Sequence, residues 1–166
     1  MKHIAYLSLG SNIGDREAHL HDAITRLRTC GRVLSISSFY ETEPVELTDQ
    51  AWFLNCAATL ETSYSAGELI GGLLAIEQQM GRHRLDKKGP RIIDIDILLF
   101  DDVVTNTPAL TIPHPAMSGR RFVLAPLAEI APEARHPVLK KTIRELLDAL
   151  PPGQIVRKLK RDSPSS

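Results

Sequence analysis

Residues 89–100 constrain the fold more strongly than any other stretch of the sequence. A Gly-Pro pair opens the stretch and favours a turn, and the Ile, Leu and Phe residues that follow are typical of a buried β-strand. Asp94 and Asp96 interrupt this apolar run, although Asp is depleted in strands. Because side chains alternate along a strand, both carboxylates should lie on one face, with Cα atoms roughly 7 Å apart.

The apolar residues of this strand divide between its two faces. Alternation places Ile95, Ile97 and Leu99 opposite the carboxylates, and Leu98 and Phe100 on the same face as them. One interpretation of the Asp face is simple solvation, since antiparallel sheets commonly leave one face in water. The apolar neighbours count against a uniformly polar face, so a functional interpretation stands beside it.

The functional interpretation is a metal site at Asp94 and Asp96. Two carboxylates this close repel each other and resist desolvation unless cations join them. Mg²⁺ prefers oxygen ligands, and a carboxylate pair can bridge two such ions ~3.5–4 Å apart in phosphoryl-transfer sites. The preceding segment 82–91 is rich in Arg and Lys, which favours a lid over a metal-bound polyphosphate. Its alternative is a solvated connection after a helix C-terminus, where basic residues are favourable.

Composition limits the class of protein. The 166 residues are 43% hydrophobic, enough for one well-filled core. Lys and Arg total 20, as do Asp and Glu, and this balance disfavours a nucleic-acid partner. No apolar run approaches the about 18 residues of a membrane span. Cys30 and Cys56 are expected to be buried thiols, and the protein is expected in the cytoplasm.

Hydrophobic periodicity predicts the element order β-α-β-β-α-β. Strands are expected at 4–9, 33–40, 53–61 and in the Asp-bearing stretch, and helices at about 15–29 and 65–81. Ser65 and Glu68 form a capping-box pattern at the start of the second helix, and Gly81 is its expected end. The order is that of the ferredoxin-like α+β fold, a mostly antiparallel sheet with both helices on one face.

The chain after the Asp-bearing strand is predicted to be less regular. Short strands are expected at 103–104 and 110–112, and a capping box at Thr142 opens a helix to about Leu150. The segment 121–130 mixes apolar residues with Pro126, and the structural alternative to a binding role for residues 120–122 is the start of a surface helix. We expect a single domain at 1–150 and a basic, mobile C-terminal tail at 151–166.

Two further groups of residues are candidates for binding. Phe53 and Asn55 lie two apart on a predicted strand, hence on one face, where they could stack a planar heterocycle and bind its edge. The alternative is a core Phe and a strand-edge Asn. His114 stands between two prolines, which suits either a phosphate donor or a structural turn. Arg120 adds a cation near Phe122.

These segments together resemble one family, the 6-hydroxymethyl-7,8-dihydropterin pyrophosphokinases of folate biosynthesis. The resemblance runs from about Ile4 to Leu150 through motifs at 9–15, 37–44, 49–50, 53–55, 89–97, 113–115 and 120–127. Its most specific part is Gly-Pro-Arg-x-x-Asp-Ile-Asp-Ile. The resemblance implies that pyrophosphate passes from ATP to the hydroxymethyl group of the pterin, releasing AMP.

The resemblance also implies roles for individual residues. Asp94 and Asp96 would bind two Mg²⁺ ions, and Arg82 and Arg91 would stabilise the charge on the leaving AMP. The implied ATP-binding residues are Glu77, Arg84, Arg91, Ile97, Thr111, His114 and Arg120. The implied pterin-binding residues are Thr42, Glu43, Pro44, Val45, Phe53, Asn55, Asp94 and Phe122.

Two rival functions use the same features. A metal-dependent phosphohydrolase would use the Asp pair with a water-positioning base and would release phosphate without any pterin. A ferredoxin-like binding module would have a solvated Asp face and no turnover. The expected partners are the two substrates, with no membrane or nucleic acid, and the expected state is a monomer.

Overall fold

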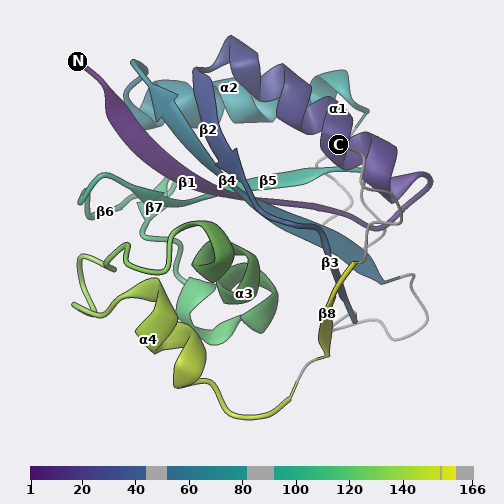
Figure 1. Cartoon of the computed structure of the whole chain (residues 1–166). Coiled ribbons are helices and arrows are strands. Elements are labelled where there is room, and N and C mark those ends of the chain that lie inside the picture. Colours follow the sequence, from purple (N-terminus) through teal and green to yellow (C-terminus); the bar gives the residue numbers. More distant parts are fainter. Residues whose placement is uncertain (44–51, 82–91, 154, 160–166) are drawn as a thin grey trace.

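The computed structural model describes residues 1–43, 52–81, 92–153 and 155–159. Its centre is a six-stranded sheet in the order β5-β1-β4-β3-β8, in which β2 also pairs with β4 (Figure 1). The sheet strands are β1 (His3–Ser11), β2 (Arg32–Ile36), β3 (Tyr40–Thr42), β4 (Phe53–Thr62), β5 (Asp94–Phe100) and β8 (Val156–Lys158). A small ribbon pairs β6 (Thr105–Asn106) with β7 (Thr111–Ile112).

Four α-helices accompany the strands in the part of the chain that is described. They are α1 (Arg16–Arg26), α2 (Ala66–Gln79), α3 (Arg121–Ile130) and α4 (Ile143–Asp148), with 3₁₀ turns at Leu27–Thr29 and Met117–Gly119. None of these helices is long and apolar enough to cross a membrane.

The predicted ferredoxin-like arrangement is confirmed. The central strands β1 and β4 pair antiparallel from His3 opposite Thr62 to Ser11 opposite Leu54, and β5 pairs antiparallel with the other side of β1. The order β1-α1-β2-β4-α2-β5 is therefore the predicted β-α-β-β-α-β, with both helices over one face of the sheet (Figure 1). The two predicted capping boxes, at Ser65 and Thr142, are both formed.

Each face of the sheet has its own hydrophobic core. The first core joins the sheet to α1 and α2 through residues such as Leu7, Leu20 and Leu73. The second joins the other face to α3 and α4 through residues such as Leu98 and Leu124. In Figure 1 the two helix layers lie above and below the sheet. Cys30 and Cys56 are free thiols in the first core, as predicted.

Helix α3 is the largest element whose extent the sequence did not predict, although it begins where a surface helix start was one of the alternatives. Pro126 lies inside it and cannot donate to the carbonyl of the preceding turn, which normally disfavours a helix interior. The helix forms because Val123, Leu124 and Leu127 bury one apolar face against the second core. Packing therefore outweighs the local propensity.

The apolar residues of strand β5 do not alternate between the two faces of the sheet as predicted. Opposite β1, Tyr6 pairs with Leu99 and Leu7 with Ile97, so Leu98 is an extra, bulged residue. Leu98 lies on the Asp face as predicted, but Leu99 joins it in the second core and Phe100 turns to the first. The carboxylates precede the bulge and keep their predicted common face.

The predicted strand at 33–40 is two strands with a break between them. At the break, Ser37 Oγ accepts a hydrogen bond from Ala57 N at 2.9 Å and donates to Ser38 O at 2.7 Å. The Ser37 side chain thus supplies one of the two bonds to Ala57, and Ser37 N supplies the other by donating to Ala57 O at 2.9 Å. The strand predicted at 103–104 is also wrong, because the first strand after β5 begins at Thr105.

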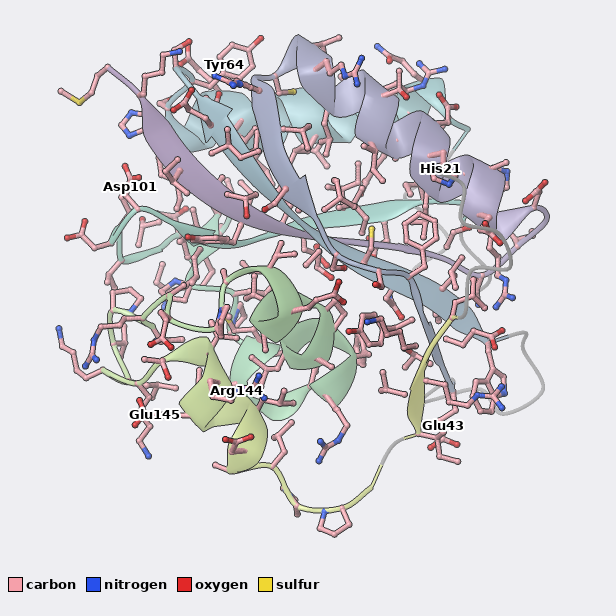
Figure 2. The ribbon with its side chains drawn as sticks, in the orientation of Figure 1. His21, Glu43, Tyr64, Asp101, Arg144 and Glu145 are labelled. Carbon is pink, nitrogen blue, oxygen red and sulfur yellow. The ribbon has the colours of Figure 1, made fainter. Side chains whose placement is uncertain are left out.

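The predicted mobile tail is partly wrong, because β8 forms after the Pro-Pro-Gly sequence. It pairs with β3 from Tyr40 opposite Lys158 to Thr42 opposite Val156. Arg157 lies over the Trp52 ring, 4.8 Å from its centroid, and Glu43 Oε1 accepts from Ile155 N at 2.8 Å. Figure 2 shows Glu43 beside β8. The sequence carries little signal for so short an edge strand.

Candidate active site

The floor of the candidate site is a row of residues across four strands. Gly10 of β1 is the Cα partner of Asp94 on one side and of Asn55 on the other, and Asn55 is in turn the partner of Tyr40. Paired residues in a sheet project to the same face. Here that is the face covered by α3, because Ala57, two residues beyond Asn55, belongs to the second core.

The Asn55 amide lies over Gly10, in the space that a larger residue at this position would fill. A Cβ built on Gly10 would lie 2.6 Å from Asn55 Nδ2 and 3.6 Å from Phe53 Cδ1, and the first distance is far inside van der Waals contact. Only glycine therefore leaves the Asn55 amide in its observed place. The sequence motif around Gly10 contained this residue, but only strand pairing shows what it separates.

Two buried polar atoms in this region have no hydrogen-bond partner among the described residues. They are Thr42 Oγ1 and Asn55 Oδ1, on side chains that are 2% and 5% exposed. Thr42 pairs with Phe53 and therefore lies on the same face of the sheet as Asn55. Because an unpaired buried polar atom is unfavourable, these two atoms are candidate contacts for a ligand.

Asp94 and Asp96 keep the side-by-side placement that the sequence predicted. Both are half-buried, opposite Gly10 and Ser8. No cluster of three or more His, Cys, Asp or Glu that could hold a metal occurs within the described ranges. Mg²⁺ does not need such a cluster, since it is commonly held by one or two carboxylates together with substrate phosphates and water. The Asp pair therefore fits this ion.

His114 lies close enough to both Arg120 and Asp94 to interact with them electrostatically. Burial lowers the pKa of His114 from its usual 6.5, the Arg120 cation lowers it further, and Asp94 opposes the shift. The backbone N of His114 donates to Leu98 O at 3.0 Å, and Ala116 N donates to His114 Nδ1 at 3.1 Å. Because Nδ1 accepts, the neutral ring carries its proton on Nε2 and can donate it to an anion.

The titration of His114 tests this cluster directly. Replacing Arg120 by Ala should raise the pKa of His114, because a neighbouring cation that disfavours the imidazolium is removed. The measurement is an NMR titration of the ring without added metal or nucleotide. Arg144→Ala on α4, with a side chain that is 56% exposed, is the control and should leave the pKa unchanged. Equal pKa values in wild type and Arg120→Ala would contradict the geometry.

The same depressed pKa has a consequence for stability. Between the pKa of folded His114 and the 6.5 of an unperturbed His, the unfolded chain binds more protons than the folded one. The contribution of His114 to the free energy of unfolding is therefore complete above 6.5 and is lost as the pH falls toward the folded pKa. Urea denaturation of wild type and His114→Gln across this range should show the smaller pH dependence in the variant.

The outer edge of β5 gathers the remaining predicted ATP-binding residues that are described. Glu77, which is 3% exposed, accepts from Ile95 N through Oε2 at 2.7 Å. Backbone N–H and C=O groups alternate in direction along a strand, so those of Ile97, two residues after Ile95, also point to the outer edge of β5. The side chain of Ile97 lies in the first core. Thr111 lies on β7, which packs beside β5.

Some predicted residues are placed differently or are not described. Arg82, Arg84, Arg91, Pro44 and Val45 lie outside the described residues. The carboxylate of Glu43 accepts from Ile155 N, so part of its bonding capacity serves β8. Phe122 is half-buried at the start of α3, with the Arg120 guanidinium 5.5 Å from its ring centroid.

Taken together, the fold and the site define an α+β protein suited to moving a phosphate-containing group to a flat acceptor. The family model for 7,8-dihydro-6-hydroxymethylpterin-pyrophosphokinase (HPPK) matches residues 6–132. The chain belongs to this family, and the predicted enzyme class, a pyrophosphate-transferring enzyme of folate biosynthesis, is confirmed.

Curated relatives support the assignment. The 2-amino-4-hydroxy-6-hydroxymethyldihydropteridine pyrophosphokinase of Bacillus subtilis is 49% identical over 132 residues, covering 78% of this chain and 79% of that protein. The protein of the same name from Methylorubrum extorquens is 44% identical over 155 residues, covering 92% and 97%. The folic acid synthesis protein fol1 of Schizosaccharomyces pombe is 45% identical over 150 residues, and the chain spans 20% of its length.

Solved structures share the fold. A crystal structure of wild-type Plasmodium falciparum HPPK-DHPS with pteroate matches 89% of this chain and 42% of that chain with a TM-score of 0.71. At 18% sequence identity, this likeness shows the fold alone.

Proposed function

We propose that this chain transfers pyrophosphate from ATP to the hydroxymethyl group of 6-hydroxymethyl-7,8-dihydropterin and releases AMP. The observation that carries the proposal is the row Asp94–Gly10–Asn55 across three paired strands. It puts a carboxylate suited to metal-bound phosphates near a buried Asn55 oxygen that has no partner among the described residues. A phosphate donor and a flat acceptor would therefore meet over Gly10.

The acceptor pocket suits a pterin, a planar ring system with donors and acceptors along one edge. Thr42 Oγ1 and Asn55 Oδ1 would bond to that edge, which supplies the partners that both atoms lack among the described residues. Phe53 and Phe122 would contact the ring faces. Glu43, Pro44 and Val45 are added to the pocket on the strength of the family resemblance.

The nucleotide side combines several cationic and polar groups. His114 Nε2 and Arg120 would donate to phosphate oxygens near Asp94, and the edge of β5 with Glu77, Ile97 and Thr111 would take the nucleoside. Arg82, Arg84 and Arg91 are proposed from the sequence as further phosphate ligands. Planar guanidinium groups suit this task because they can bond two oxygens at once.

Asp94 and Asp96 would hold Mg²⁺, two ions by the family resemblance. When bound, Mg²⁺ stabilises the charge that develops on the transferring phosphates. The pterin hydroxyl oxygen forms a bond to the β-phosphorus, and the bond between that phosphorus and the oxygen of the α-phosphate breaks. AMP leaves with the electron pair, and the hydroxyl proton is released. Arg82 and Arg91 would stabilise the leaving charge.

The nucleotide product tests the proposal. With ATP, Mg²⁺ and 6-hydroxymethyl-7,8-dihydropterin, the enzyme should form AMP and the pterin diphosphate in equal amounts, measured by ion-exchange chromatography. Phosphate release without pterin would instead indicate the phosphohydrolase, and pterin binding without loss of ATP would indicate a binding module. The cytoplasmic location and the monomeric state stay predictions of the sequence.

Thr42→Val should stabilise the protein and weaken pterin binding. Valine keeps the shape of Thr42 but removes a buried hydroxyl that has no partner among the described residues, so we expect about 1 kcal/mol more stability in urea denaturation. The dissociation constant for the pterin, measured by calorimetry, should rise about tenfold.

Thr62→Val provides a matched control. Thr62 is also buried in the sheet, but its hydroxyl donates to Cys30 O at 2.6 Å and accepts from Tyr64 N at 3.0 Å. This variant should lose about 1–3 kcal/mol of stability and bind the pterin normally. A Thr42→Val protein that is less stable than wild type, or that binds the pterin equally well, would contradict the assignment.

A further inference from the structure

Glu129 of α3 reaches across to the break between β2 and β3. Its Oε2 accepts from both Ser38 N and Ser38 Oγ at 3.0 Å, and its Oε1 accepts from the Tyr40 hydroxyl at 2.6 Å. Sequence reasoning assigned no role to Glu129, because nothing in the spacing connects residues about ninety positions apart. The three bonds tie a helix on the second core directly to a strand of the candidate site.

Strand β3 is only three residues long, and an irregular step at Ser37 separates it from β2, so the pairing of β2 with β4 does not by itself fix its register. Its other side-chain restraint within the described residues is Glu41, which accepts from Arg16 of α1 at 3.0 Å and from Arg157 at 3.3 Å. The neighbour of β3 on the outer side, β8, is equally short. Short strands specify register weakly, and a slip of one residue turns every side chain to the other face.

The register of β3 determines where the pterin-binding atoms lie. Tyr40 is opposite Asn55, and Thr42 is opposite Phe53. A slip would turn Thr42 Oγ1 away from the α3 face and change the packing beside Asn55. Tyr40 shares a face of the sheet with Thr42 and Asn55. It is therefore the residue through which a contact from α3 can act on these two side chains.

The charges around the cluster agree with an ionised Glu129. Burial alone would raise its pKa, but the bonds from Tyr40 and Ser38 and the Lys158 cation lower it overall. The pKa of Tyr40 is raised, first by burial and then by Glu129, so Tyr40 stays a donor. Lys158 comes from β8, opposite Tyr40. Hydrogen bonds to a charged group are the stronger kind.

We propose that Glu129 is a positioning residue for the acceptor: by holding Ser38 and Tyr40, it sets the register of β3 that presents Thr42 and Asn55 to the pterin. This inference rests on the proposed function, because it assigns the pocket to the pterin. Glu129 itself touches neither substrate. Its removal should affect the pterin side of the reaction and spare the nucleotide side.

The test compares Glu129→Ala with Glu129→Gln. Alanine loses all three bonds, and we expect the dissociation constant for 6-hydroxymethylpterin, measured by calorimetry, and the KM for the dihydropterin to rise about tenfold or more. The KM for ATP should stay within about twofold, because the nucleotide groups lie beyond Asp94 from β3. Glutamine should restore binding, since its oxygen can accept from Ser38 while its NH₂ donates to the Tyr40 oxygen.

Two further variants complete the design. Tyr40→Phe loses one of the three bonds, so the dissociation constant for 6-hydroxymethylpterin and the KM for the dihydropterin should rise less than in Glu129→Ala. This variant keeps the proposal testable if Glu129→Ala folds poorly. Glu133→Ala removes an exposed carboxylate from the connection after α3 and should leave both substrates unaffected. Circular dichroism would check that each variant is folded.

The outcomes separate this inference from the proposed function. A lower melting temperature for Glu129→Ala with unchanged pterin constants would mean that Glu129 only anchors α3, and the proposal would be overturned. Equal losses for pterin and ATP would overturn it as well. A wild-type enzyme that forms no AMP would overturn the proposed function, and this inference with it.

Discussion

Asp94→Asn and Asp96→Asn should each lower kcat by about a thousandfold or more while the protein stays folded. Each variant removes one of the two carboxylates proposed to hold Mg²⁺ against the ATP phosphates. Asparagine keeps the size of the side chain and reduces the repulsion between the two strand neighbours, so β5 should still pair with β1. The measurements are AMP formation and circular dichroism.

A nearby aspartate serves as the control for these variants. Asp102 is the second residue after β5 and is exposed, so Asp102→Asn changes the same amount of charge without touching the proposed site. Its kcat should equal that of wild type. Near-normal turnover in either Asp94→Asn or Asp96→Asn would contradict the carboxylate-pair model, whatever the control shows.

Gly10→Ala should weaken pterin binding by about tenfold to a hundredfold and lower stability by about 1–3 kcal/mol. The new methyl group would lie 2.6 Å from Asn55 Nδ2, so the amide must move away from the position in which it would bond to the pterin edge. Calorimetry with 6-hydroxymethylpterin and urea denaturation measure the two effects. The KM for ATP should change less than that for the pterin.

Gly71→Ala provides the same substitution where space is available. Gly71 lies in α2, and nothing is within 4 Å of a Cβ built on it. Alanine there should stabilise the protein by about 0.5–1 kcal/mol, because it lowers the entropic cost of the helix, and should leave both substrates unaffected. If Gly10→Ala behaved like Gly71→Ala, Gly10 would not shape the acceptor pocket.

Local patterns predicted most of the first half of the fold. The βαββαβ order, both capping boxes and the common face of Asp94 and Asp96 follow from periods and spacings within single elements. Such features depend on neighbours a few residues away, so no knowledge of the partner strands is needed. The side-by-side carboxylates are the clearest example.

Features that depend on contacts between distant segments were not predictable. The bulge at Leu98 arises from the pairing of β5 with β1, and it reversed the expected faces of Leu99 and Phe100. Helix α3 contradicts the local signal of Pro126 and exists because its apolar face is buried. Strand β8 is too short to be recognised without β3 beside it.

The sequence by itself determined the chemistry of the site residues and the family resemblance that the comparisons confirmed. Tertiary structure alone decided that Gly10 separates Asp94 from Asn55, that Thr42 and Asn55 carry buried atoms without partners among the described residues, and that Glu129 holds Tyr40. The physical reason is that strand register and burial are collective properties. They depend on which segments pack together, and the residues within one segment do not specify that.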